Sequence, residues 1–244
     1  MTIEEKKRKL VQYLEQDIEY NQKLYECVNG GKVDAKSWYD ELWDMIQDYG
    51  KRTNYTSGFK NWGGVIIDTK YPVNAISLYE LFSDCRKLET IPNVTCANTN
   101  GQYDSCYCAF QMCLKLKSID FDVMNGGSGN TAWTAAFRYC QELTNIKKIG
   151  VLESQVFNKT FEYCFKLENI VVEGTIGQNG FDIHWSTLLS ADSLKSIINA
   201  LSTTTTGLTI TLPTTAQANY EAVYGTGSWS VLVTTRSNWT IAYA

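Results

Sequence analysis

The chain has 244 residues, of which 44% are hydrophobic and 20% are charged, and its net charge is −4. This length and apolar content suffice for a substantial core, and acidic and basic residues are interspersed along the chain. The composition therefore argues against a nucleic-acid-binding protein and against binding to an anionic membrane. No apolar run is long enough to span a bilayer, so we expect no membrane insertion.

Two helices are predicted near the N-terminus. Apolar residues recur at alternating steps of three and four in residues 4–28, with Asn21 in the same series, and Gly30-Gly31 ends the helix. A second helix is predicted from Ala35 to Tyr49. Two interpretations stay open. The helices pair as a hairpin that caps the middle part of the chain, or the first helix forms a homo-oligomer or attaches the chain to a larger particle.

Four copies of one pattern, Phe-x-x-Cys-x-x-Leu-x-x-Ile, occupy the middle of the chain, at intervals of 24 to 28 residues. The copies are Phe82/Cys85/Leu88/Ile91, Phe110/Cys113/Leu116/Ile119, Phe137/Cys140/Leu143/Ile146 and Phe161/Cys164/Leu167/Ile170, and a degenerate fifth reads Leu188/Ala191/Leu194/Ile197. Val65-Ile66-Ile67 is predicted as a short buried strand ahead of them. Such self-similarity is typical of a solenoid, in which each unit buries its apolar residues against its neighbours.

The pattern resembles the BspA-like subgroup of leucine-rich repeats, whose units read roughly Ala-Phe-x-x-Cys-x-x-Leu-x-x-Ile. Ala109-Phe110 and Ala136-Phe137 match it with the alanine included, and the resemblance covers about residues 75–200. The tail from Ser190 to Ile241 is similar to the C-terminal cap of such proteins from gut bacteria and their phages. The units are longer than is usual in the subgroup, so we expect loops at Asn93–Tyr107 and Asn125–Asn130.

The resemblance implies an α+β fold: a leucine-rich-repeat solenoid of about five repeats, with an N-terminal helical hairpin and a small C-terminal α/β cap. The implied domains are a helical cap or attachment region at 1–64, the repeats at 65–200 and a capping module at 201–244. Five elements are expected towards the C-terminus. They are a helix at Asp192–Leu201, a strand at Leu208–Leu212, a helix at 215–224 and closing strands at Trp229–Val233 and Trp239–Tyr243.

In such a unit, the leucine and isoleucine start a strand, and the phenylalanine and cysteine turn inward behind it. The expected structural ladders are Phe82, Phe110, Phe137 and Phe161, and Cys85, Cys113, Cys140 and Cys164. A zinc site requires converging ligands, which a linear ladder does not provide, so we favour buried thiols over a metal or disulfides. A hydroxyl in this interior would be unpaired, so Cys140→Ser is expected to cost about 1–3 kcal/mol, and Cys140→Ala less.

Residues beside the inward isoleucines should point outward on the strands. The candidate binding residues are Thr90, Ser118, Asp120, Asn145, Lys147, Asn169 and Ser196. Short polar side chains dominate this set, which suits hydrogen bonding to a glycan or to a polar protein surface.

No catalytic arrangement is recognised in the sequence. It has one histidine, His184, and lacks the glycine-flanked nucleophile, metalloprotease and phosphate-loop motifs. We therefore expect no catalytic residues, no cofactor and no metal, and interpret the chain as a non-enzymatic binding or structural protein.

The resemblance implies a phage virion component, such as a tail-fibre, head-fibre or baseplate-associated protein. Its expected partners are a protein or glycan on the host cell surface, or other virion proteins. The charged first residues lack the apolar segment of a secretory signal, so we expect synthesis in the host cytoplasm and assembly into the virion. The alternatives are a bacterial surface adhesin and an intracellular protein-binding scaffold.

Overall fold

The computed structural model of the protein describes residues 60–61, 73–75, 78–91, 94–96, 106–124 and 131–244. These residues form seven strands and three helices. The strands are β1 (Val73–Ala75), β2 (Val94–Cys96), β3 (Ser118–Met124), β4 (Asn145–Val151), β5 (Asn169–Gly174), β6 (Leu208–Leu212) and β7 (Trp239–Tyr243); the helices are α4 (Ala191–Ala200), α5 (Ala216–Tyr224) and α6 (Ser228–Thr234). Both predicted N-terminal helices, the strand at Val65–Ile67 and most of the two predicted loops lie outside the described residues.

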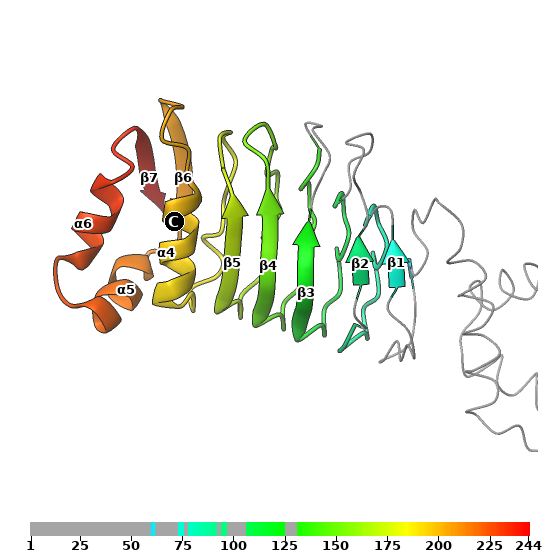
Figure 1. The fold of residues 1–244 in the computed structure, drawn as a ribbon. Helices are drawn as coiled ribbons and strands as arrows, with labels where there is room; N and C mark the ends of the chain where they lie inside the picture. The colour runs from blue at the N-terminus through cyan, green and yellow to red at the C-terminus, as the bar shows by residue number, and fades with distance from the viewer. Residues whose placement is uncertain (1–59, 62–72, 76–77, 92–93, 97–105, 125–130) are drawn as a thin grey trace, which may run out of the picture.

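The strands form three separate parallel sheets. β1 pairs with β2, β3 and β5 flank β4, and β6 pairs with β7. In the three-stranded sheet, Ile119 lies opposite Ile146, which in turn lies opposite Ile170. Figure 1 shows β1 to β5 side by side in chain order, with all arrows pointing the same way.

The predicted leucine-rich-repeat solenoid of about five repeats is wrong for the described part of the chain. Its strands form small sheets of two and three strands instead of one sheet through all the repeats. The fifth unit contributes the helix α4, because Ser190 caps the helix and Leu194, Ile197 and Ile198 are buried at helical spacing. Its first position also differs, because Leu188 is 52% exposed and Phe181 packs against the preceding phenylalanine instead.

Each Phe-x-x-Cys segment forms a tight turn. The residues two positions before and two positions after that phenylalanine have positive φ angles, between 49° and 64°. The pairs are Glu80/Asp84, Cys108/Met112, Ala135/Tyr139 and Lys159/Tyr163. A non-glycine residue in this region costs about 1–3 kcal/mol, so the surrounding contacts must hold the turn in place.

Backbone hydrogen bonds hold successive turns together. The amide of Phe82 donates to Ala109 O (2.8 Å), Phe110 donates to Ala136 O (2.8 Å), and Phe137 donates to Thr160 O (3.0 Å). Asn61 has a φ of 64° and donates its amide to Ser83 O at 2.8 Å, and Asp84 likewise donates to Gln111 O at 2.7 Å. The stacked turns therefore extend at least to Asn61, which precedes the predicted domain boundary at 64/65.

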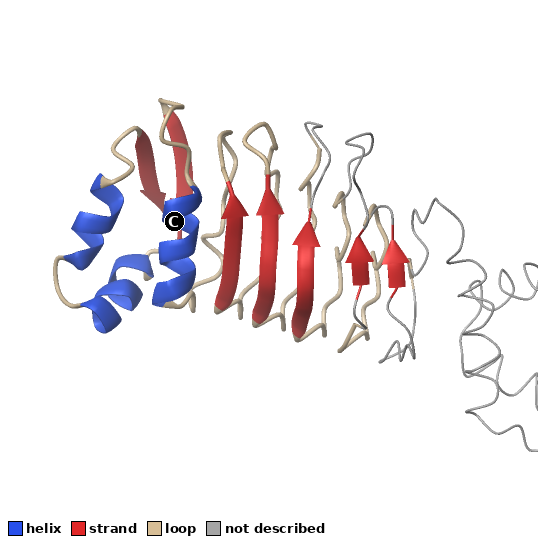
Figure 2. Ribbon diagram, viewed as in Figure 1, coloured by secondary structure: helices blue, strands red, loops and turns tan. Residues whose placement is uncertain are grey.

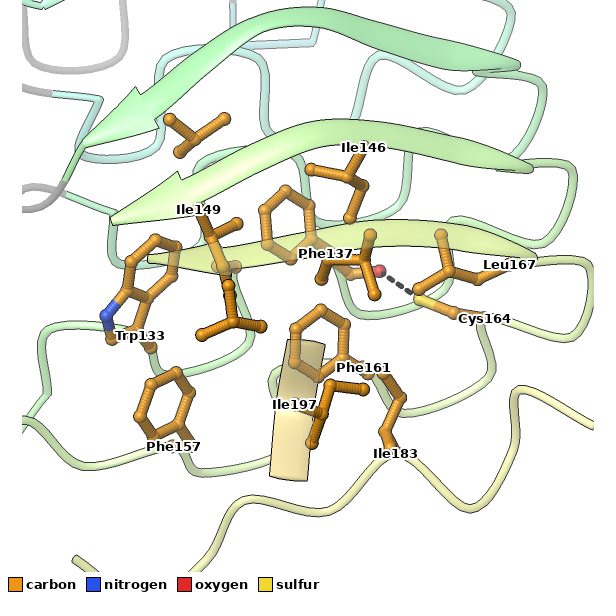
Figure 3. Packing of buried hydrophobic residues seen from close by; sticks show 14 of the residues in the cluster. Trp133, Phe137, Ile146, Ile149, Phe157, Phe161, Cys164, Leu167, Ile183 and Ile197 are labelled. Atoms are coloured by element: carbon orange, nitrogen blue, oxygen red, sulfur yellow. Dashed lines mark hydrogen bonds between the residues drawn. The ribbon is translucent and has the colours of Figure 1, made fainter. Parts of the chain in front are cut away.

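The core consists largely of aromatic rings stacked between turns. Phe82, Phe110, Phe137 and Phe161 are fully buried, and each neighbouring pair has centroids 5.5 Å apart and planes within 13°. Trp133 stacks on Phe157 at 5.8 Å beside this series (Figure 3). Each buried phenylalanine contributes about 1.5–3 kcal/mol by burial alone.

Three helices and the β6–β7 pair gather at the C-terminal end of the described residues (Figure 2). The predictions of α4, β6, α5 and β7 are confirmed, with helix ends shifted by about one residue. The predicted strand at Trp229–Val233 is wrong, because these residues belong to α6. Trp229 and Leu232 share the buried side of this helix, while Val231 is 70% exposed.

Candidate functional site

The outward side of the three-stranded sheet carries a row of short polar side chains. Ser118 of β3 lies opposite Asn145 of β4, which lies opposite Asn169 of β5, so the three are one strand spacing apart. Their neighbours Ile119, Ile146 and Ile170 are buried on the other side, since strand residues alternate between faces. We call Ser118, Asp120, Asn145 and Asn169 the polar row.

The members of the polar row differ in their hydrogen bonding. Ser118 donates its hydroxyl to Asp120 Oδ2 at 3.0 Å, and Asp120 is exposed. The carboxamides of Asn145 and Asn169 make no side-chain hydrogen bond within the described part of the chain, and Asn169 is exposed. Both amides therefore retain two donors and an acceptor for a ligand or for water.

Charged residues lie farther along the same strands. Irregular pairing between β3, β4 and β5 leaves two consecutive lysines, Lys147 and Lys148, between the buried Ile146 and Ile149. Lys148 Nζ lies 2.9 Å from Asp122 Oδ2 and 2.8 Å from Glu173 Oε2, so one ammonium bridges β3 and β5.

These ion pairs shift the ionisation of their members. Glu173 and then Asp122 raise the pKa of Lys148 above its ordinary value. Lys148 and then Lys147 lower the pKa of Asp122. Lys147, a predicted binding residue, also joins these ion pairs, because its Nζ is 3.0 Å from Asp122 Oδ1. The ammonium of Lys147 is therefore paired with a carboxylate and is less available to a ligand.

Two other candidates lie apart from the polar row. Thr90 is exposed on the segment before β2, outside the three-stranded sheet. Ser196 belongs to α4, where its hydroxyl accepts from Val172 N (2.8 Å) and donates to Val172 O (3.3 Å). Ser196 therefore holds the helix against the edge of β5.

The ladder cysteines are buried thiols that are engaged with the backbone. The Sγ atoms of Cys113, Cys140 and Cys164 donate to the carbonyl oxygen of the phenylalanine one turn earlier, at 3.0 to 3.1 Å. Figure 3 shows the bond from Cys164 to the carbonyl of Phe137. Burial raises the pKa of Cys140 well above its ordinary value and that of Cys164 to about 12. These thiols are therefore protonated and poorly nucleophilic at neutral pH.

The side chains of the polar row can form hydrogen bonds to a ligand. In the segments that the structure describes, no group of three or more His, Cys, Asp or Glu side chains is placed to hold a metal ion. His184, to which no sequence motif gives a role, is paired with Asp182 through Nδ1 and Oδ1 at 2.6 Å. None of the described helices is both long enough and apolar enough to cross a membrane.

Comparison with protein-family models, curated proteins and solved structures finds no match to the chain.

Proposed function

We propose that this chain is a non-enzymatic binding protein whose recognition surface is the polar row on β3, β4 and β5. The observation that carries the proposal is the in-register placement of Asn145 and Asn169, whose carboxamides keep their hydrogen-bonding capacity. Short side chains on a paired sheet lose little conformational entropy when they bind, so they suit a ligand with many polar groups.

The expected ligand is a protein or a glycan on the surface of a host cell. We further propose that the chain is a phage virion component, such as a tail-fibre, head-fibre or baseplate-associated protein. This part rests on the resemblance of the Phe-x-x-Cys units to BspA-like proteins, which include virion proteins, and is an argument by analogy. Capsid, portal or tail genes beside the gene for this chain would support it, and a cell-wall or secretion locus would contradict it.

The polar row is tested with the double substitution Asn145→Arg and Asn169→Arg. Both side chains lie on the outward side of the sheet, so the larger residues should leave the melting temperature unchanged while filling the recognition surface. Binding of the fluorescently labelled protein to intact gut bacterial cells is measured by flow cytometry across a panel of strains. We expect at least a tenfold loss of binding, about the effect of 1.4 kcal/mol.

The matched control is the pair Asn158→Arg and Gln178→Arg. It adds the same two charges at exposed positions whose side chains make no hydrogen bond to described residues. The control should bind like the unmodified protein. Equal binding by both double variants would overturn the assignment of the polar row.

A further inference from the structure

A second surface is formed by aromatic side chains on successive turns. Tyr139 and Tyr163 occupy the position two residues after Phe137 and Phe161, and their rings stack with centroids 4.6 Å apart and planes at 18°. Trp185 continues the series at 4.6 Å from Tyr163, and Phe165 packs edge-on against Trp185 at 5.7 Å. We call Tyr139, Tyr163, Phe165 and Trp185 the aromatic row.

The aromatic row is partly open to solvent. Phe165 is 40% exposed, and the two tyrosines and Trp185 are half-buried. The hydroxyls of Tyr139 and Tyr163 and the indole nitrogen of Trp185 have no hydrogen-bond partner among the residues described. Because the tyrosine rings stack on each other and Arg138 lies over Tyr139, the row offers ring edges and the exposed part of Phe165, together with free polar groups along one line.

The charged groups beside the aromatic row are already paired. Arg138 lies 4.8 Å over the ring of Tyr139 and donates Nε to Glu162. His184 packs 4.7 Å from Trp185 and is paired with Asp182 at 2.6 Å. Arg138 thus has an acidic partner, and the groups of the aromatic row itself carry no charge at neutral pH, which disfavours a strongly charged ligand.

We propose that the aromatic row binds an uncharged oligosaccharide. The C–H groups of a sugar ring can pack on the exposed ring edges and on Phe165, and its hydroxyls can bond to the phenol and indole groups. The row continues from turn to turn at about the strand spacing, roughly 4.8 Å, which suits a linear ligand with repeating units. Because its residues precede β4, β5 and α4 in their units, the inference does not rest on the polar row.

The test is calorimetric titration of the full chain with neutral hexasaccharides of β-linked glucose, mannose and N-acetylglucosamine, at concentrations up to the millimolar range. We expect binding of at least one of them. Trp185→Ala and Tyr163→Ala should each weaken that binding about tenfold, whereas Trp185→Phe should retain most of it because an aromatic ring remains. Melting temperatures show whether each variant is folded.

The matched control is Tyr224→Ala. Tyr224 also packs, at a tilt, against a tyrosine, Tyr220, at 4.7 Å and lies under a cation, Lys195, but it belongs to α5. This variant, and Asn145→Arg with Asn169→Arg, should bind the saccharide normally, which separates the aromatic row from the polar row. No binding to any hexasaccharide, or binding unchanged in folded Trp185→Ala and Tyr163→Ala proteins, would overturn the proposal. A protein captured through these residues without saccharide binding would also overturn it.

Discussion

The repeated cysteine has a specific partner in the backbone. Cys140 donates Sγ–H to Phe110 O at 3.1 Å, and the same oxygen accepts the amide of Cys113 at 3.1 Å. The two lone pairs of a buried carbonyl are thus both used. Small size and a weak donor explain why cysteine recurs here, where a larger hydrophobic residue would collide with the stacked turns.

Because Phe110 O accepts a hydrogen bond at this position, the predicted stability cost of Cys140→Ser relative to Cys140→Ala is reversed. A serine hydroxyl at position 140 can donate to Phe110 O, although its shorter bond to Cβ lengthens the contact, whereas alanine leaves that oxygen with one donor. We expect Cys140→Ser to be no more destabilising than Cys140→Ala, and both to cost about 1–2 kcal/mol. Urea unfolding of both variants measures the difference. A serine variant less stable than the alanine variant would favour the unpaired hydroxyl assumed from sequence.

The buried thiols also make stability depend on alkaline pH. Burial raises the pKa of Cys164 from 9.0 to about 12, so the unfolded chain loses this proton at lower pH than the folded chain does. The stabilisation is therefore complete below about pH 9 and is lost as pH rises towards 12, by up to about 1.4 kcal/mol per pH unit for each such thiol.

The free energy of unfolding, measured in urea at several alkaline pH values, should fall steadily above about pH 9. The Cys164→Ala variant is the control, since it retains every tyrosine but lacks this thiol. Its free energy of unfolding should decline less steeply than that of the unmodified protein. Identical slopes would mean that Cys164 is not held as a buried thiol.

The helix α4 ends the three-stranded sheet by replacing the hydrogen bonds of a further strand with serine hydroxyls. Ser193 accepts from Ile170 N at 2.9 Å and donates to Glu168 O at 3.0 Å. Ser196 does the same for Val172, one helical turn later. The edge of β5 is thus covered and cannot pair with another chain.

Ser193→Ala should therefore destabilise the protein by about 1–3 kcal/mol, because it leaves the buried amide of Ile170 without a partner. Ser230→Ala in α6 is the matched control, since Ser230 is exposed. It should change the free energy of unfolding by less than about 0.5 kcal/mol. Chemical denaturation of both variants measures the difference, and a Ser193→Ala protein as stable as the control would mean that water replaces the hydroxyl.

Elements with a clear period were predictable from sequence, and α6 was not. Leu208–Leu212 alternates regularly, and Ser190 precedes a run with apolar residues at helical spacing, so β6 and α4 follow from local patterns. The run Trp229–Val233 favours a strand by residue type. Tertiary packing decides otherwise, because Trp229 packs edge-on against Tyr220 of α5 at 5.5 Å, and residue type alone does not reveal that contact.

For the molecule as a whole, alternation along each strand was enough to place the polar row. The spacing between the copies also indicates which residues lie opposite each other on neighbouring strands, as Asn145 and Asn169 do. The ion pairs of Lys148 depend on irregular pairing within the sheet, which the sequence does not reveal. The aromatic row was not predicted because it lies outside the positions that all four copies of the pattern share. Aromatic residues two places after Phe137 and Phe161 were the available signal.

The fold places the ladder thiols of the turns inward and the carboxamides of the polar row outward. Site-resolved alkylation with iodoacetamide, read by mass spectrometry of native Asn145→Cys and Asn169→Cys proteins, tests that placement directly. The introduced thiols should react readily, and Cys140 and Cys164, both fully buried, should react only on unfolding. An unreactive thiol at 145 or 169 would contradict the account, because a shift of one residue exchanges the two faces of a strand. A native Cys140 that reacts as fast as the introduced thiols would contradict the inward packing of the turns.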